Sequence, residues 1–189
     1  MVRYMGLDIS SVATGVSIID RLPNGSLKLV AHDVISSSYK KEIGLRLVMF
    51  AETLQTFLDE YQPDFIVREE TINNRASNAI LYKFLGVVQF LARNNGYDKT
   101  YEYYPTTIKK TVVGHGRASK MAVAEECSKY FTEDFDGLTE DETDSIGAVL
   151  THLIKDDTLR IVTVAEQQGY EEHEKAQEEL VEGYLNGEQ

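Results

Sequence analysis

The sequence has few of the residues that mark secreted or membrane proteins: its 189 residues include one cysteine, three prolines and no tryptophan. A single cysteine, Cys127, excludes an intrachain disulfide and fits a reducing compartment. No apolar run approaches the roughly 20 residues that a membrane span needs, and the N-terminus has no signal-peptide pattern. These absences predict a cytoplasmic protein without a membrane partner, and the length suits one domain with its own core.

Basic residues are also scarce, since 19 lysines and arginines stand against 31 acidic residues and give a net charge of −12. The deficit is concentrated at the C-terminus, where residues 156–189 carry a net charge of −8. Residues 71–124, in contrast, include eight basic and two acidic residues, a net charge of +6. This basic middle is either a phosphate-binding surface or a solvated surface balanced by acids elsewhere, and charge alone favours neither.

The periodicity of apolar residues predicts an α/β fold with five strands, of which the first three form an antiparallel meander. A strong hairpin turn, Leu22-Pro23-Asn24-Gly25, separates the second strand from the third. The expected strands span residues 2–9, 15–20, 27–35, 65–70 and 100–104. The expected helices span residues 41–60, 76–93, 118–131 and 140–155, with a short helical turn at 106–110.

The chain after residue 155 differs from the rest. Residues 156–165 contain a candidate short strand, and from Glu166 the chain is polar and charged with little to bury. We therefore expect residues 1–155 to form the folded domain. Residues 156–189 are expected to form an acidic C-terminal extension that is partly helical or disordered.

Two acidic residues mark the start of the helix expected at 140–155. Asp141 and Asp144 are three residues apart, so their side chains share one helical face. Acidic residues at a helix start commonly cap free N–H groups and complement the helix dipole, and this explanation suffices for one aspartate. Two carboxylates that point the same way repel each other, however, and a divalent cation would offset that repulsion.

Acidic residues also lie on two of the expected strands, Asp8 on the first and Glu69 and Glu70 at the end of the fourth. If these strands are neighbours and the last helix packs across them, the acids converge with Asp141 and Asp144. Carboxylates are suitable ligands for Mg²⁺ or Mn²⁺, whereas the sequence has no Cys/His spacing typical of zinc. A cluster of four carboxylates can hold two ions roughly 3.5–4 Å apart for phosphodiester hydrolysis.

Four sequence blocks, taken in order, resemble the RuvC family of Holliday-junction resolvases. They are MGLDISSVATGVSIID, PDFIVREE, KKTVVGHGRASK and DETDSIGAVLTH, and the resemblance covers residues 3–155. The third block is similar, nearly residue for residue, to the DNA-contacting loop and helix of the family. The resemblance implies an RNase H-like fold with a five-stranded mixed sheet, in which the first three strands are antiparallel and helices flank the sheet.

The resemblance also implies an active site with two Mg²⁺ ions, for which Mn²⁺ would substitute. The implied catalytic and metal-binding residues are Asp8, Glu69, Asp141 and Asp144. Glu69 is preferred to Glu70 because the family's acid stands three residues before a bulky apolar residue, here Ile72. Strand alternation by itself leaves the choice between Glu69 and Glu70 open.

The implied substrate is branched DNA, above all a four-way junction that a homodimer nicks symmetrically in two opposed strands. The helix at 76–93 matches the family's dimer helix, which suits its nearly all-round apolar character. Lys109 and Lys120 match the family's phosphate-contacting lysines. The full set of candidate DNA-binding residues is Lys109, Lys110, Lys120, Arg117, Ile72 and Arg75.

The sequence departs from the family in three places. Ile72 stands where the family often has an aromatic residue that stacks at the junction centre, which leaves sequence preference and base-pair opening undetermined. His115 replaces an apolar residue of the glycine loop, either as a phosphate contact or as an exposed bystander. The acidic extension has no counterpart in short family members and points to a bacteriophage version of the resolvase.

Other functions remain compatible with parts of the sequence. One is a broad branch-specific nuclease with little sequence preference, and another is a catalytically silent junction-binding protein, which the intact acidic set argues against. A third is a sugar-kinase-like or actin-like ATPase, but the chain lacks the length for a second lobe and a glycine-rich phosphate motif. The remaining candidates are interpreted as structural rather than as ligands or base-stacking groups: His32, His152, Tyr101, Tyr103 and Tyr104.

Overall fold

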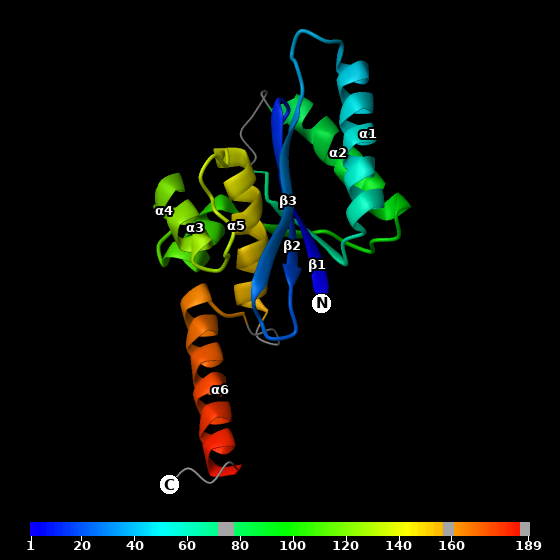
Figure 1. The fold of residues 1–189 in the computed structure, drawn as a ribbon. Coiled ribbons are helices and arrows are strands. Elements are labelled where there is room, and N and C mark those ends of the chain that lie inside the picture. The colour runs from blue at the N-terminus through cyan, green and yellow to red at the C-terminus, as the bar shows by residue number, and fades with distance from the viewer. Residues whose placement is uncertain (72–77, 157–160, 186–189) are drawn as a thin grey trace.

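The structure, a computed structural model, describes residues 1–71, 78–156 and 161–185, and it is built around one five-stranded mixed sheet (Figure 1). The strand order is β3-β2-β1-β4-β5. The first three strands are antiparallel, and β4 and β5 run parallel to β1 and β4 respectively. The strands are β1 Val2–Asp8, β2 Ala13–Arg21, β3 Leu27–Ser36, β4 Phe65–Glu69 and β5 Tyr101–Tyr103. The expected mixed sheet is thus confirmed.

Two helices, α1 (Ile43–Tyr61) and α2 (Asn78–Asn94), cover one face of the sheet (Figure 1). Their buried side chains, among them Phe50 and Phe84, form a core with β-strand residues such as Leu7. The rings of Phe50 and Phe84 meet edge to face, with centroids 5.1 Å apart. This helical layer packs against β1 and β4, the two strands at whose ends Asp8 and Glu69 lie.

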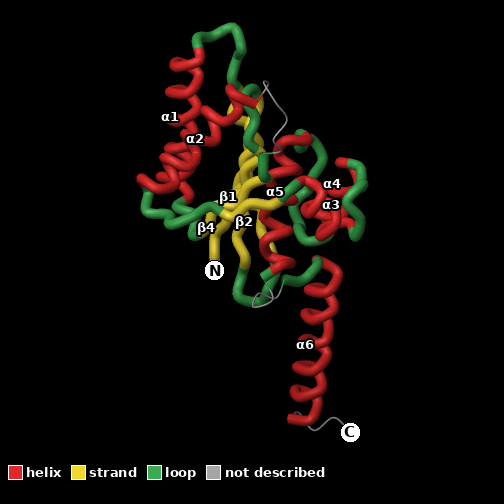
Figure 2. The backbone as a smooth tube through the Cα atoms, turned by 180° about the vertical axis from the view of Figure 1, so that it is seen from behind, coloured by secondary structure: helices red, strands yellow, loops and turns green. Residues whose placement is uncertain are grey.

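The opposite face is covered by α5 (Glu140–Lys155), with α3 (Pro105–Val113) and α4 (Lys120–Ser128) packed outside it (Figures 1 and 2). Eleven residues of α5 are buried, because this helix lies between the sheet and the two shorter helices. A second core fills the space between them and includes Ile108, Val123 and Ile146.

Glycine lets α5 approach β1 and β2 unusually closely. A Cβ atom added to Gly15 would lie 1.9 Å from the carbonyl oxygen of Asp141, and one added to Gly6 would lie 2.3 Å from that of Ser145. Such distances are far inside van der Waals contact, so any larger side chain would push the helix away. Because Gly15 pairs with Asp8 across the β1–β2 ladder, this contact brings the first turn of α5 next to Asp8.

The structure corrects three expectations about the second half of the chain. The short helical turn expected at 106–110 is the longer helix α3, which begins at Pro105, because proline is favoured in the first helical turn, where its missing N–H is not needed. The helix expected at 118–131 is shorter, Lys120–Ser128, with Ser119 as its cap. No strand forms at 161–163, and the rest of that candidate strand lies partly outside the described residues.

The C-terminal part forms a helix, α6 (Val164–Leu185), that extends away from the body of the molecule (Figures 1 and 2). Its start is fixed by two backbone hydrogen bonds, from Val162 N to Gly25 O at 3.1 Å and from Val164 N to Lys129 O at 2.8 Å. Within the described ranges, no helix combines the length and apolar character needed to cross a membrane.

Candidate active site

Three elements bring acidic side chains to one edge of the sheet. Leu7 of β1 pairs with Arg68 of β4, so Asp8 and Glu69 follow on adjacent parallel strands and leave the sheet side by side. The close contact at Gly15 places Asp141 of α5 against the partner of Asp8 in the β1–β2 ladder. The convergence expected from the order of the elements is therefore found.

The pKa values show how strongly these carboxylates affect one another. Burial, followed by the negative charges of Asp144 and Asp141, raises the pKa of Asp8 to about 7. Burial, followed by the charges of Asp8 and Asp144, raises the pKa of Glu69 to about 8. Burial also raises the pKa of Asp141, with a smaller contribution from Asp144. Asp144 thus acts electrostatically on the other three acids, and Asp8 and Glu69 resist carrying a negative charge near neutral pH.

Glu69, rather than Glu70, belongs to this unit. Glu70 Oε2 lies 3.8 Å from the guanidinium of the buried Arg68, which also forms an ion pair with Glu102 of β5. Arg68 Nη1 in turn donates a hydrogen bond to the carbonyl oxygen of Glu69 at 3.3 Å. The charge of Arg68 is therefore directed to Glu70 and Glu102, while the carboxylate of Glu69 is left to interact with Asp8 and Asp144.

A lysine supplies positive charge inside the acidic cluster. Lys120, the first residue of α4, lies with its Nζ 2.8 Å from Asp144 Oδ2 and 3.2 Å from Glu140 Oε2. Partial burial lowers the pKa of Lys120, but the hydrogen bonds and charges of Asp144 and Glu140 outweigh burial and raise it overall. Lys120 also lowers the pKa of Asp8 and Glu69. This ammonium group partly neutralises the carboxylates.

The other candidate DNA-binding residues are distributed around this cluster. Lys109 on α3 is close enough to Glu69 to lower its pKa. Lys110 and Arg117 are exposed, and no ion pair between them and the acids is seen in the described part of the chain. His115 is exposed in the loop between α3 and α4. Ile72 and Arg75 lie outside the described residues.

The start of α5 is capped by residues other than the two aspartates. Thr139 and Glu142 form a reciprocal capping box, in which Glu142 N donates to Thr139 Oγ1 at 3.2 Å and Thr139 N donates to Glu142 Oε2 at 2.7 Å. His32 Nδ1 on β3 lies 2.6 Å from Glu142 Oε1 and ties the cap to the sheet. Asp141 and Asp144 are thus left for another role, and the capping explanation does not account for them.

Sequence reasoning missed this support for the first turn of α5. The T-x-x-E spacing of Thr139 and Glu142 is a recognisable capping signal. The capping box could therefore have been predicted from the sequence. The contact from His32 bridges 110 residues of sequence, and no local pattern announces it. The charged Arg68 within an apolar strand was a similar signal, because a buried arginine requires acidic partners.

The cluster fits divalent cations by the chemistry of its donors. Asp8, Glu69, Asp141 and Asp144 offer only carboxylate oxygens, the preferred ligands of Mg²⁺ and Mn²⁺. Their mutual repulsion and the Lys120 ammonium beside Asp144 both indicate a site that stabilises positive charge. Among the described residues no three side chains are already arranged as a metal-ligand group, so cation binding would require the carboxylates to move closer together.

Two cavities of similar size flank the acidic cluster. One, of about 210 Å³, lies between the ends of β1 and β4 and is lined by Asp8, Glu69 and Glu70, with Leu81 of α2 on its wall. The other, of about 200 Å³, lies between α4 and α5 and reaches Lys120 and Asp144. The acidic cluster therefore lies between two cavities, an arrangement that suits a site over which an extended polymeric ligand passes.

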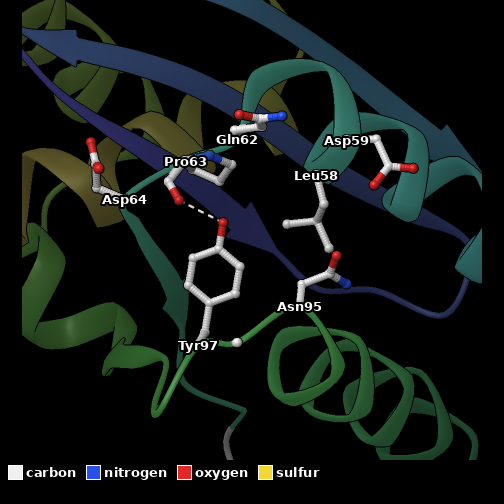
Figure 3. A pocket seen from close by; sticks show the side chains of 8 residues that line it. Leu58, Asp59, Gln62, Pro63, Asp64, Asn95 and Tyr97 are labelled. Atoms are coloured by element: carbon white, nitrogen blue, oxygen red, sulfur yellow. Dashed lines mark hydrogen bonds between the residues drawn. The ribbon is translucent and has the colours of Figure 1, made fainter.

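The opposite end of the sheet has a different character. A cavity of about 410 Å³ lies between the ends of α1 and α2, and Figure 3 shows Asp59, Gln62 and Asn95 around it. The hydroxyl of Tyr97 donates to the carbonyl oxygen of Pro63 at 2.5 Å across its wall (Figure 3). This cavity therefore lies at the end of the sheet where β1 begins, whereas the acidic cluster lies where β1 ends.

Structural contacts are found, as expected, for His32, His152, Tyr101 and Tyr103. The expectation is wrong for Tyr104, which lies beyond the end of β5, at the N-cap of α3. His152 packs among Tyr4, Tyr101 and Tyr103, and its Nδ1 lies 2.9 Å from the hydroxyl of Tyr103. This position is near the beginning of β1, well away from Asp8. Tyr101 and Tyr103 pack against the second core, whereas Tyr104 is exposed.

Comparison with known proteins agrees with this fold. The family model described as "Crossover junction endodeoxyribonuclease RuvC" matches residues 4–152. A protein of that description from Finegoldia magna is 30% identical over 152 residues, covering 80% of this chain and 92% of the relative.

Solved structures show the same architecture. The structure described as Thermus thermophilus RuvC in complex with a Holliday junction substrate superposes with a TM-score of 0.73 at 21% identity, covering 80% of this chain and 93% of the other. The fowlpox virus Holliday junction resolvase gives a TM-score of 0.52 at 18% identity, with 80% and 97% coverage. The expected RNase H-like fold is therefore confirmed.

Proposed function

The chain belongs to the RuvC family of crossover junction endodeoxyribonucleases, and we propose that it is itself a structure-selective endonuclease that resolves Holliday junctions and other branched DNA. The single observation that carries this proposal is the convergence of Asp8, Glu69, Asp141 and Asp144 at one edge of the sheet, where burial and the neighbouring negative charges raise the pKa values of Asp8, Glu69 and Asp141. A cluster of this kind is suited to divalent cations and to phosphodiester hydrolysis.

We assign the four acids as the catalytic and metal-binding residues. Asp8 and Glu69 approach from adjacent strands, and Asp141 and Asp144 approach from the first turns of α5. Two bound Mg²⁺ ions would supply an activated water and stabilise the leaving oxygen. The Thr139–Glu142 capping box fixes the first turn of α5, so that Asp141 and Asp144 are held in position before any cation binds.

The lysines beside the acids are suited to bind the DNA backbone. Lys109 and Lys120 are the two cations that act electrostatically on Glu69, so phosphate oxygens bound to them would lie next to the carboxylates. Lys110 and Arg117 are exposed on the same segment and would contact phosphates farther along the strand. Ile72 and Arg75 remain proposed DNA contacts from sequence alone.

A homodimer would allow paired nicks in two strands. The helix that we propose as the dimer contact, α2, exposes large apolar side chains that a monomer would leave in water, namely Ile80, Tyr82 and Phe90. The rest of α2 is anchored by the core that it shares with α1. Pairing through α2 would hold two active sites in a fixed relation, as symmetric cleavage of a four-way junction requires.

The proposed function is tested with a labelled immobile four-way junction, a flap and a linear duplex, each incubated with the protein in Mg²⁺ or in EDTA. Paired symmetric nicks in the junction alone, in Mg²⁺ alone, are the expected result. Cleavage of every branched form would favour the alternative of a broad branch-specific nuclease. Junction binding without cleavage in both Mg²⁺ and Mn²⁺ would instead identify a catalytically silent junction-binding protein.

The domain boundaries, the origin of the protein and its location in the cell are also proposals. Residues 1–155 would form the nuclease domain and residues 156–189 an acidic extension, of which α6 is the helical part. The acidic extension supports a bacteriophage version of the resolvase, acting in the cytoplasm of the bacterial host. The curated relative from Finegoldia magna is bacterial, so this origin rests on the extension alone.

A further inference from the structure

The groove between α4 and α5 has a composition that the catalytic acids do not explain. It has a volume of about 200 Å³, and its lining includes the apolar groups of Met121, Ala124 and Leu138. Thr143 and the charged groups of Lys120, Glu140 and Asp144 complete the lining. A groove that combines apolar and charged groups fits a ligand that is itself partly apolar and partly charged.

Met121 is the most informative of the lining residues. It is 72% exposed, although it is a large apolar side chain at the first turn of α4 and immediately follows Lys120. A methionine in this position can adapt its shape to a flat, polarisable partner at little cost in free energy, because its side chain is flexible and its sulfur is polarisable. The wall therefore presents an apolar surface in a place where a surface protein helix usually presents a polar one.

Lys120 connects the groove to the acidic cluster. Its Nζ is 2.8 Å from Asp144 Oδ2, and its charge reaches Asp8 and Glu69. A phosphate held by Lys120 would therefore lie at the boundary between the cluster and the groove. The carboxylates of Asp144 and Glu140 make the inner edge of the groove negative, which directs the phosphate toward Lys120 and the uncharged part of a ligand toward Met121 and Leu138.

We propose that this groove binds the nucleoside on one side of the phosphodiester that is cut, with its base or sugar against Met121 and Leu138 and its phosphate on Lys120. The proposal rests on the proposed function, since it places a segment of DNA strand across the acids. A volume of about 200 Å³ is below that of pockets for drug-sized ligands, and it suits one unpaired nucleoside rather than a base pair. The nucleoside at this position is therefore unstacked from its neighbour.

The first test scans the substrate. After the cut phosphodiester has been mapped, abasic tetrahydrofuran residues replace single nucleotides on each side of it in a four-way junction, and single-turnover nicking is measured in Mg²⁺. We expect one flanking position to lose about tenfold in rate when its base is removed, in keeping with the loss of one base contact. Equal rates at all positions would overturn the proposal.

The second test combines the substrate with the protein. Met121→Ala should slow nicking of the intact junction by about fivefold, yet leave nicking of the junction that is abasic at the sensitive position unchanged. This coupling is the readout that a general effect on folding or DNA affinity would not give. Met49→Ala on α1, across the sheet, is the matched control and should behave as wild type on both junctions. Independent, additive effects of Met121→Ala and base removal would contradict direct contact.

A third measurement does not depend on cleavage. A junction with 2-aminopurine at the sensitive position, mixed with the protein in EDTA, should show an increase in fluorescence as the base leaves its stack. Ala124→Leu, which narrows the groove, should abolish the increase while thermal unfolding shows an intact fold. If no junction is nicked under any condition, the proposed function fails. If nicking is normal but insensitive to the flanking base and to Met121→Ala, only the groove assignment fails.

Discussion

At the edge where β1 and β4 end, the carboxylates of Asp8 and Glu69 face other carboxylates, and their pKa values rise to about 7 and about 8. At the edge where β1 begins, Asp20 is buried but receives hydrogen bonds from Arg3 Nε at 2.7 Å and Nη2 at 2.8 Å. Asp64 in turn accepts from the backbone N–H of Arg3 at 2.7 Å. The same sheet thus carries acids that repel one another at one end and acids that are paired at the other.

The difference separates stability from function within one sheet. A buried carboxylate that is paired contributes to the folded state, because its hydrogen bonds offset the loss of hydration. A group of carboxylates without enough positive partners opposes folding, and such strain persists where a ligand is meant to relieve it. The paired end therefore stabilises the scaffold on which the unpaired end is displayed.

The largest effect should come from removing one member of the unpaired group. Asp144→Asn is expected to reduce junction nicking by about 10³-fold or more, a loss of about 4 kcal/mol in transition-state stabilisation, while leaving junction binding within about threefold of wild type. Single-turnover nicking and gel-shift titration on the same junction measure the two quantities. A variant that loses binding together with nicking would show that Asp144 is not specifically catalytic.

The next effect concerns the contact that joins α5 to the sheet. Gly15→Ala would place a methyl group 1.9 Å from the carbonyl oxygen of Asp141, and we expect it to lower the free energy of unfolding by about 3 kcal/mol and to disperse the acids. Urea unfolding and nicking measure both losses. Gly169→Ala on α6, where an added methyl group meets no atom within 4 Å, is the control and should leave nicking unchanged.

At the paired end, Asp20→Asn should lower stability without affecting chemistry. It removes the charge that holds Arg3, at a cost of about 2 kcal/mol in the free energy of unfolding. Nicking per folded molecule, measured at a temperature well below the unfolding midpoint, should match that of wild type. A loss of nicking comparable to that of Asp144→Asn would erase the distinction between the two ends.

The last effect is a pH dependence that only the unpaired end should show. The pKa values of Asp8 and Glu69 in the folded state exceed the usual carboxyl range near 4. In the unfolded chain these groups lose their protons near pH 4, whereas in the folded chain they keep them until pH 7 to 8. The free energy of unfolding of the metal-free protein should therefore fall as pH rises from 5 to 9, by up to about 1.4 kcal/mol per pH unit for each of the two groups until its folded-state pKa is reached.

Urea unfolding in EDTA at several pH values tests this dependence. Asp144→Asn should make the dependence less steep without abolishing it, because burial is the first cause of both raised pKa values and the charge of Asp144 is a further one. Asp20→Asn should leave the slope intact and lower the whole curve. A wild-type protein equally stable at pH 5 and pH 9 would contradict the account of the acidic cluster.

Local sequence patterns predicted the elements well where one physical rule decided them. The strands β1 to β3 follow from alternation and from the Pro23-Asn24-Gly25 turn, and α5 follows from a stripe of apolar residues behind Asp141. Lys155 was correctly placed at the end of α5. The chain after residue 155 was harder, because charge and low hydrophobicity fit both a frayed helix and disorder, and α6 gains little from tertiary contacts.

The candidate site was predictable in its residue types but not in its arrangement. Sequence reasoning identified the acids, and the parallel pairing of β1 and β4 was a condition of their convergence rather than a consequence of any local pattern. Local patterns left the choice between Glu69 and Glu70 open, and only the tertiary structure shows that the Arg68 guanidinium lies 3.8 Å from Glu70 Oε2 and forms an ion pair with Glu102. The tie between His32 and Glu142 spans 110 residues and had no local signal.

The sequence by itself determined most of the helices and strands and the chemical nature of the site, because apolar periodicity and carboxylate groups are properties of the chain. Only the tertiary structure decided which carboxylates repel one another and which are paired with hydrogen-bond donors, because that depends on strand order and on the distance between α5 and the sheet. Gly15 shows the link between the two: its residue type is visible in the sequence, yet its importance appears only where Asp141 lies against it.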